Sequence, residues 1–319
     1  MSVENGKAKS MKTYDLIIVG SGPAGMTASI YAARANLSVL MLDKLAPGGQ
    51  IVNTNEIQNY TGMGTINGAE LAIQMYQHTQ ELNVEFDYRT VEEVKEENGL
   101  KLVCCKEDGA VYAARAVILA TGTRPRTLGV ENEKKYAGNG ISWCAICDGA
   151  ACRGQDVVVI GGGNSAVEES IYLAEIVKSL TIVTMFDLTA DPMACDKLRA
   201  MDHVTIYPYQ DVLEFYGDKK LQGIHFKSTK DDGTERRLDC DKVFEYIGLT
   251  PTTECFQSLG VLNKMGYVEV DEHMATKLPG VFGAGDCITK NLRQVITACA
   301  DGAIAAQSAA HYIQSTFKR

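Results

Sequence analysis

The sequence predicts an α/β fold built from two dinucleotide-binding, Rossmann-like domains, the second inserted in the first. Two glycine-rich turns, at residues 20–25 and 161–166, each lie between a short apolar run and a helical stretch. Two further apolar runs, ending near residues 120 and 247, each lead into a turn where we expect the chain to change domain. We therefore expect a first domain made of residues 1–120 and 247–319, and an inserted domain at residues 121–246.

Composition and charge restrict the class of protein. Of 319 residues, 45% are hydrophobic and 22% are charged, as in an ordinary globular chain. The formal net charge of −9 disfavours nucleic acid and anionic membrane partners, because both need concentrated Lys and Arg. No apolar run is long enough to span a membrane, and Met1 to Lys12 lack the apolar core of a signal peptide. We expect a cytoplasmic protein that binds neither nucleic acid nor membrane.

The first glycine turn follows the apolar run Tyr14 to Val19 and precedes a helical stretch, Met26 to Asn36. Gly20 permits the tight turn, and Gly22 lets the backbone approach a pyrophosphate at the helix N-terminus. Gly25 lets the helix pack closely against the strand. A strand, a glycine turn and a helix in this order predict a dinucleotide site.

Carboxylates follow two other strands of the same predicted domain. The strand Ser38 to Leu42 runs into Asp43, about where an acidic side chain binds a ribose hydroxyl. The run Val281 to Asp286 likewise ends in a carboxylate, and Arg293 and Gln294 precede an alanine-rich helix.

A second unit of the same kind begins with the strand Asp156 to Ile160 and continues into a glycine turn and a helix, Val167 to Val177. Leu180 to Met185 is the expected strand after that helix. The intact turn predicts a second dinucleotide site. Its expected binding residues are Gly161, Gly163, Asn164, Ser165 and Ala166.

Between the two turns lies a pair of cysteines, Cys144 and Cys147, at the spacing that closes a small disulfide ring. When the pair is reduced, one thiolate can attack a bound disulfide and the other can resolve the mixed species. Asp148 follows directly, with a carboxylate available for proton transfer. Paired cysteines also bind zinc, but the chain has no second such pair, and Cys104 and Cys105 are adjacent in an apolar run. Redox use is favoured over a structural zinc site or inert cysteines, and we expect no metal.

The motifs GSGPAG, APGGQ, ATGTRPR, WCAICDG, GGGNSAVEE, GLTP, GAGDC and RQVITA occur in this order. In order and approximate spacing they resemble the low-molecular-weight thioredoxin reductases over essentially the whole chain. The resemblance implies a homodimer with FAD in the discontinuous domain. It also implies that electrons pass from a nicotinamide through the flavin to the dithiol, and then to thioredoxin or a thioredoxin-like protein.

The resemblance assigns a role to each site residue. Cys144 would be the interchange thiol that attacks the disulfide of thioredoxin, Cys147 the thiol nearer the flavin, and Asp148 the proton-transferring acid. Gln50 and Asn59 would face the isoalloxazine ring. The residues expected to bind FAD are Gly20, Gly22, Pro23, Ala24, Gly25, Asp43, Gly49, Gln50, Asn59, Gly122, Asp286, Arg293 and Gln294.

The sequence departs from the family pattern after the second glycine turn. Members that use NADPH carry His-Arg-Arg at the end of this strand and another Arg three residues on, which bind the 2′-phosphate. Here Thr184, Met185 and Phe186 occupy the triplet, Asp187 follows, and no Lys or Arg occurs between residues 178 and 197. Each lost charge-assisted hydrogen bond is worth about 1.5–3 kcal/mol, and Asp187 would repel the phosphate. NADPH is therefore disfavoured, while NADH and a protein donor such as ferredoxin remain open.

Three functions fit these patterns. The leading one is an FAD-dependent, thioredoxin-type disulfide reductase with an unusual electron donor, where the intact turn favours NADH. The second is a small-molecule disulfide reductase or a dithiol oxidase, and the third is a slowly turning over flavin redox sensor.

Overall fold

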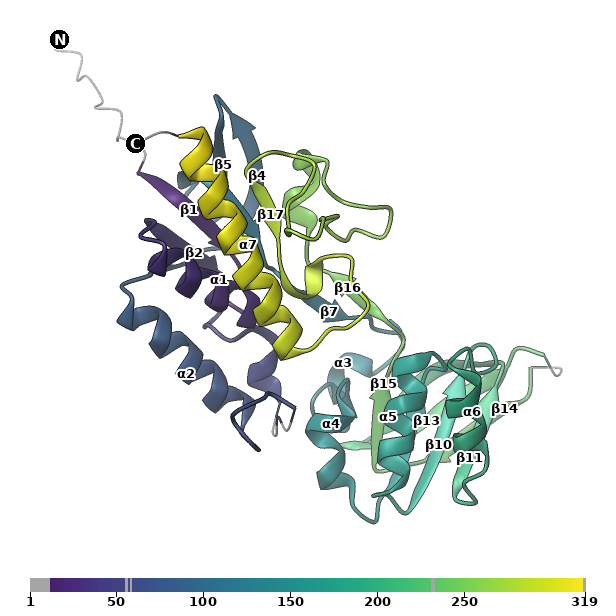
Figure 1. The fold of residues 1–319 in the computed structure, drawn as a ribbon. Coiled ribbons are helices and arrows are strands. Elements are labelled where there is room, and N and C mark those ends of the chain that lie inside the picture. The colour runs from purple at the N-terminus through teal and green to yellow at the C-terminus, as the bar shows by residue number, and fades with distance from the viewer. Residues whose placement is uncertain (1–11, 55–56, 58, 231–232, 318–319) are drawn as a thin grey trace, which may run out of the picture. The chain divides into compact units, whose positions relative to one another are not determined.

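The computed structural model describes residues 12–54, 57, 59–230 and 233–317 (Figure 1). The side chains of Asn53, Ile146 and Cys147 also lie outside the described part. The chain divides into two compact units, with boundaries at Thr123/Arg124 and Thr250/Pro251. Unit 1 contains the N-terminal and C-terminal parts of the chain, and unit 2 contains residues 124–250 together with the short segment Thr54–Ile57.

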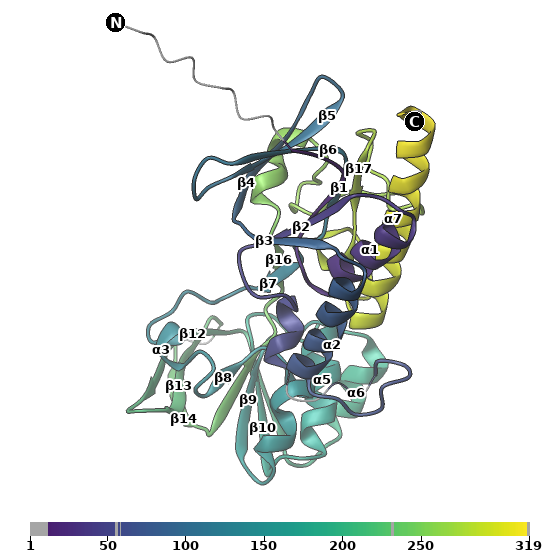
Figure 2. The ribbon, with the colours of Figure 1, turned by 90° about the vertical axis from the view of Figure 1, so that its left-hand side faces the viewer.

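A seven-stranded sheet forms the centre of unit 1. Six strands follow the order β3-β2-β1-β6-β5-β4, and β17 pairs with β6 outside this path. The first four of these and β17 are parallel, whereas β4, β5 and β6 form an antiparallel meander (Figure 2). The strands are β1 (Thr13–Val19), β2 (Val39–Asp43), β3 (Glu85–Tyr88), β4 (Val91–Glu97), β5 (Leu100–Cys105), β6 (Val111–Leu119) and β17 (Val281–Gly283).

In the described part of unit 1, three α-helices and three short 3-10 helices accompany the sheet. The α-helices are α1 (Pro23–Arg34), α2 (Gly68–Glu81) and α7 (Val295–Thr316), and the 3-10 helices are η1 (Gly49–Asn53), η3 (Glu254–Leu259) and η4 (Gly285–Cys287). α1 begins at Pro23 rather than at the expected Met26, because proline suits the first helical position, where no amide hydrogen is needed.

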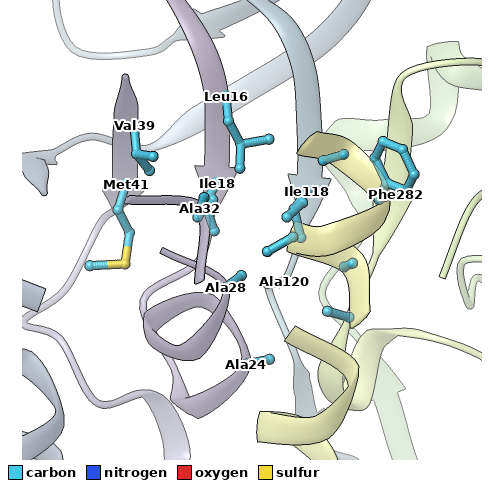
Figure 3. Packing of buried hydrophobic residues seen from close by; sticks show 14 of the residues in the cluster. Leu16, Ile18, Ala24, Ala28, Ala32, Val39, Met41, Ile118, Ala120 and Phe282 are labelled. Atoms are coloured by element: carbon cyan, nitrogen blue, oxygen red, sulfur yellow. The ribbon is translucent and has the colours of Figure 1, made fainter. Parts of the chain in front are cut away.

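Helices α1 and α7 lie side by side although more than 250 residues separate them in the sequence (Figure 1). Small side chains permit this approach: a Cβ added at Gly302 of α7 would collide with the Ala24 carbonyl of α1. Figure 3 shows Ala24 and Ala28 between the two helices, below the buried strand residues Ile18 and Ile118. The C-terminal helix is thereby fixed to the helix that follows the first glycine turn.

Unit 2 contains a five-stranded parallel sheet in the order β11-β10-β9-β15-β8. A separate antiparallel sheet has the order β12-β13-β14. The strands are β8 (Ile141–Ser142), β9 (Asp156–Ile160), β10 (Ser179–Thr184), β11 (Val204–Pro208), β12 (Gln210–Gly217), β13 (Leu221–Ser228), β14 (Glu235–Asp239) and β15 (Lys242–Glu245). The helices are α3 (Glu133–Tyr136), α4 (Ala145–Asp148), η2 (Gly149–Cys152), α5 (Asn164–Ala174) and α6 (Pro192–Arg199).

The chain passes between the units twice, and the two connecting strands pair with each other. β7 (Thr123–Pro125) and β16 (Leu249–Pro251) form a two-stranded sheet. None of the helices in the described part of the chain is both long and apolar enough to cross a membrane.

Candidate active site

The first glycine turn joins β1 to α1 in unit 1. Gly20 has a φ of 110°, and a Cβ there would collide with the Ala120 carbonyl. A Cβ at Gly25 would collide with the Gly20 carbonyl, so α1 can pack this closely against the turn only if residue 25 is glycine. Gly22 is the N-cap of α1, and no described side chain caps that helix start. The first-turn amides therefore point into space that suits a pyrophosphate.

Asp43 fixes the turn from the end of β2. Its Oδ2 accepts hydrogen bonds from the Ser21 amide at 2.7 Å and the Ser21 hydroxyl at 2.8 Å, and its Oδ1 accepts from the Leu45 amide at 3.1 Å. The carboxylate thus lies directly beside the phosphate-binding turn, where a ribose hydroxyl is bound in this fold.

Two more predicted residues follow neighbouring parallel strands. Gly122 comes after β6 with a φ of 67°, and its carbonyl accepts from the Thr252 amide at 3.0 Å. Asp286 comes after β17, and its buried Oδ1 has no hydrogen-bond donor among the described residues. Burial raises the pKa of Asp286, while Lys290 and Arg293 act to lower it. A buried, unsatisfied carboxylate oxygen can accept a hydrogen bond from a ligand hydroxyl.

The side chain of Arg293 binds the backbone of this loop. Its Nε donates to the Asp286 carbonyl at 3.2 Å, and its two terminal nitrogens donate to the carbonyls of Lys290 and Ile288 at 3.2 and 3.3 Å. The guanidinium also stacks over the Tyr267 ring, 4.7 Å from the ring centre. Arg293 therefore orients Asp286 in this structure, rather than presenting a free cation.

The amide side chains expected at the flavin ring also meet. Asn59 Nδ2 donates to Gln294 Oε1 at 3.0 Å, although the two residues are 235 positions apart. Gln50 Nε2 donates to the Thr123 carbonyl at 3.3 Å. Gly49 lies against the first turn, where a Cβ would be 3.1 Å from the Gly22 Cα. The residues of unit 1 therefore fit FAD: an open helix start, a ribose-side carboxylate, a buried unsatisfied carboxylate and exposed amides all follow the carboxyl ends of parallel strands.

In unit 2 the second glycine turn joins β9 to α5 with similar geometry. Gly161 has a φ of 133°, and a Cβ there would collide with the Tyr246 carbonyl. Gly163 is the N-cap of α5, and again no described side chain caps the helix start. Asn164 and Ser165 are exposed, whereas Ala166 is buried in the core of the unit. The turn retains the features that accept a pyrophosphate.

The segment after β10 folds back against this turn. The Thr189 amide donates to the Gly162 carbonyl at 2.7 Å, and the Asp191 amide donates to Asn164 Oδ1 at 3.0 Å. Thr184 occupies the position after Gly161 that Asp43 occupies after Gly20, 23 residues on. The second turn therefore lacks the strand-end carboxylate of the first.

The strand end itself is apolar and exposed. Met185 is 54% exposed and Phe186 is 64% exposed. The structure corrects the expected role of the next residue, because Asp187 is not a lone charge: Arg199 of α6 donates to its Oδ1 at 2.9 Å. Arg199 lies outside the interval between residues 178 and 197 that has no Lys or Arg. It reaches Asp187 because it is the last residue of α6.

The cysteine pair lies at the start of α4, in the same unit. Cys144 is disulfide-bonded, and the side chain of Cys147 lies outside the described part of the chain. Asp148 ends α4, and its Oδ2 lies 3.5 Å from Lys242 Nζ on β15. Eight other cysteines are free, and the described residues contain no cluster of three or more potential metal ligands.

Comparisons with known proteins agree with this geometry. A family profile described as "Pyridine nucleotide-disulphide oxidoreductase" matches residues 14–302. A Bacillus subtilis protein named "Thioredoxin reductase" is 41% identical over 313 residues, which cover 95% of this chain and 96% of that protein. The chain belongs to the low-molecular-weight thioredoxin reductase family.

Solved structures of family members extend the match to the fold. The thioredoxin reductase of Streptococcus pyogenes is 42% identical with a TM-score of 0.78, and that of Lactococcus lactis, in the FR conformation, is 38% identical with a TM-score of 0.77. Both matches cover 95% of this chain and 99% of the other. The predicted family and the two Rossmann-like domains are confirmed. As a family member, the protein is a flavin-dependent oxidoreductase that holds FAD.

Proposed function

We propose that the protein is a thioredoxin-type disulfide reductase, in which electrons reach the Cys144/Cys147 pair by way of FAD and leave to thioredoxin or a thioredoxin-like protein. The observation that carries the proposal is the disulfide-bonded Cys144 at the start of α4, within a unit that holds an intact nucleotide turn. Bound FAD supplies two-electron transfer between the donor and this disulfide.

We assign the roles of the two thiols from the family resemblance, in which the first cysteine of the pair is the interchange thiol. Two electrons and two protons convert the disulfide to two thiols. The Cys144 thiolate then attacks one sulfur of the substrate disulfide and releases the other sulfur as a thiolate. Cys147 displaces the substrate from the mixed disulfide, which restores the intramolecular bond and frees a substrate dithiol. Asp148, beside Lys242, is the acid we assign to proton transfer at this pair.

We infer that NADH, rather than NADPH, is the nicotinamide donor. Support comes from the open start of α5 and from the exposed apolar pair Met185 and Phe186 where a 2′-phosphate would need cations. Arg199 is a cation near this place, but Asp187 already binds it. The residues assigned to the nicotinamide nucleotide remain Gly161, Gly163, Asn164, Ser165 and Ala166.

The same family membership supports a homodimer in the cytoplasm. It also supports the assignment of residues 1–120 and 247–319 to the FAD domain and of residues 121–246 to the nicotinamide-type domain. The compact units divide close to these positions.

Anaerobic stopped-flow spectra of the flavin test the function and the donor together. We expect NADH to bleach the flavin and oxidised thioredoxin to restore its colour. Reduction by ferredoxin but by neither nicotinamide would overturn the NADH assignment and leave the reductase intact. Reoxidation by O₂ but not by thioredoxin would instead indicate a dithiol oxidase, and slow reaction with every acceptor would indicate a redox sensor.

A further inference from the structure

Two buried carboxyl groups lie together behind the redox segment of unit 2. Glu245, the last residue of β15, is 2% exposed, and Glu133, the first residue of α3, is 3% exposed. Glutamate is rarely buried this completely unless its charge is paired or hydrogen-bonded. The two side chains interact with each other, so each places a second acid in the surroundings of the first.

The two carboxyl groups are held differently. Glu133 accepts the amides of Leu128 at 2.7 Å and Gly129 at 2.6 Å, one on each oxygen. Glu245 accepts only at Oε2, from the Trp143 indole Nε1 at 2.9 Å, and its buried Oε1 has no donor among the described residues. A proton on Oε1 gives this atom a hydrogen-bond partner, because the resulting hydroxyl can donate to the Glu133 carboxylate. Burial, followed by the charge of Glu133, raises the pKa of Glu245 to about 8.

No cation is among the described groups that act on Glu245, which are Glu133 and Trp143. Charged side chains on the surrounding elements are engaged elsewhere. They are Lys242 on β15 with Asp148, Asp156 on β9 with Lys178, Glu214 on β12 with Arg237, and Lys135 on α3 over the Tyr136 ring. Arg126, near Gly248, and Lys134 are exposed. The shared proton is therefore the main means of relieving repulsion between the two acids.

The end of β15 also holds the backbone around Cys144. Glu245 binds the side chain of Trp143, the residue before Cys144. The hydroxyl of Tyr246 accepts from the amide of Ala145, the residue after it, at 2.5 Å. Two successive residues thus fix both neighbours of the cysteine.

We propose that Glu245 is a positioning residue for thiol–disulfide exchange at Cys144: while it shares a proton with Glu133 it holds Trp143 in place, and loss of that proton releases Trp143. The inference rests on the proposed function only in taking Cys144 as the exchanging thiol. Two ionised carboxylates in this buried site repel each other, and one must move toward water. Glu133 is tied by two backbone amides and Glu245 by one indole, so Glu245 and its indole contact give way.

Trp143 is the single tryptophan of the chain, so its fluorescence reports on this contact in the intact holoenzyme. We expect its emission to titrate with a midpoint near pH 8. Glu245→Gln should abolish the midpoint, because the amide carbonyl can accept the indole hydrogen and the amide nitrogen can donate to Glu133 at every pH. Retention of the midpoint in Glu245→Gln would overturn the proposal. This measurement needs neither an electron donor nor thioredoxin, so it does not depend on the proposed function.

The exchange step is tested with dithionite-reduced holoenzyme and a small chromogenic aryl disulfide. Thiolate formation changes the rate in every variant, so the informative quantity is the ratio of the wild-type rate to the Glu245→Gln rate at each pH. We expect this ratio to fall by about tenfold as the pH rises through the fluorescence midpoint, the factor that corresponds to about 1.4 kcal/mol. A ratio independent of pH would overturn the positioning role even if the fluorescence titrates.

Two further variants serve as a control and as a second test of the shared proton. Glu175→Gln removes an exposed carboxylate at the end of α5 and should leave the fluorescence midpoint unchanged. Glu133→Gln removes the neighbouring charge and should lower the midpoint, which provides a test if Glu245→Gln folds poorly. An unchanged midpoint in Glu133→Gln would show that the two acids do not share a proton.

Discussion

Arg199 and Asp187 form an ion pair at 2.9 Å beside the second glycine turn, between α6 and the segment that follows β10. Their side chains are 44% and 53% exposed, so the pair itself contributes at most about 1 kcal/mol to stability. In the nicotinamide site that we propose, a 2′-phosphate at the end of β10 would lie beside this pair, and Asp187 would compete with the phosphate for Arg199.

NADPH should therefore reduce the flavin no better than NADH. Asp187→Asn should release Arg199 and improve the Michaelis constant for NADPH by about tenfold, the value of one charge-assisted hydrogen bond of about 1.5 kcal/mol. Asp196→Asn changes an exposed residue on the same helix and serves as the control. It should leave the Michaelis constants for NADH and NADPH unchanged. Steady-state kinetics with both donors provide the measurement.

The double variant Met185→Arg/Phe186→Arg should improve the use of NADPH more than Asp187→Asn does, because two guanidiniums would replace the exposed apolar pair. We expect a gain for NADPH of about two orders of magnitude, with little change for NADH. A low-micromolar Michaelis constant for NADPH in the unaltered protein would contradict the interpretation of this strand.

The bound flavin should be FAD rather than FMN. The turn of Gly20, Gly22 and Gly25 and the open start of α1 accept a pyrophosphate, which FMN lacks. Mass spectrometry of the flavin released from the purified protein distinguishes the two. Release of FMN alone would remove the basis for the role given to this turn.

The two cysteines should differ in trapping experiments. Cys147→Ser leaves Cys144 able to attack thioredoxin but removes the resolving thiol, so a stable mixed disulfide should accumulate. Cys144→Ser should trap nothing, although its flavin should still be reduced. Non-reducing electrophoresis with thioredoxin provides the readout, and trapping that requires Cys147 would reverse the two assignments.

Local patterns predicted several elements in both units. The strand Asp156–Ile160 and the start of helix α7 at Val295 agree with the expected positions, because an apolar run with adjacent glycines, or a long alanine-rich stretch, leaves few alternatives. By contrast, no pattern predicted the antiparallel sheet β12-β13-β14. Polar residues such as Glu214, Arg236 and Arg237 interrupt the alternation of apolar and polar residues that marks a strand. The pairing of these three strands depends on contacts within unit 2.

Pairs of side chains distant in sequence were also beyond prediction. Arg199 meets Asp187 because α6 packs beside the end of β10, and Glu245 meets Glu133 although 112 positions separate them. A single sequence shows that these residues exist, but periodicity fixes only which face of an element they occupy, not which partner they meet. The motif residues were predictable because their spacing is local, and the partners that tune them were not.

The free energy of unfolding should depend on pH through Glu245. Its pKa is raised from an ordinary value of 4.5 to about 8 in the folded protein, first by burial and then by the charge of Glu133. Between these two values the folded protein keeps a proton that the unfolded chain has lost, so stability falls as the pH rises and levels off above the folded pKa. Glu245→Gln cannot titrate, so its stability relative to wild type should increase across this window, by on the order of 2–4 kcal/mol. Urea denaturation at a series of pH values measures the difference, and parallel curves for the two proteins would show that Glu245 ionises normally in the folded state.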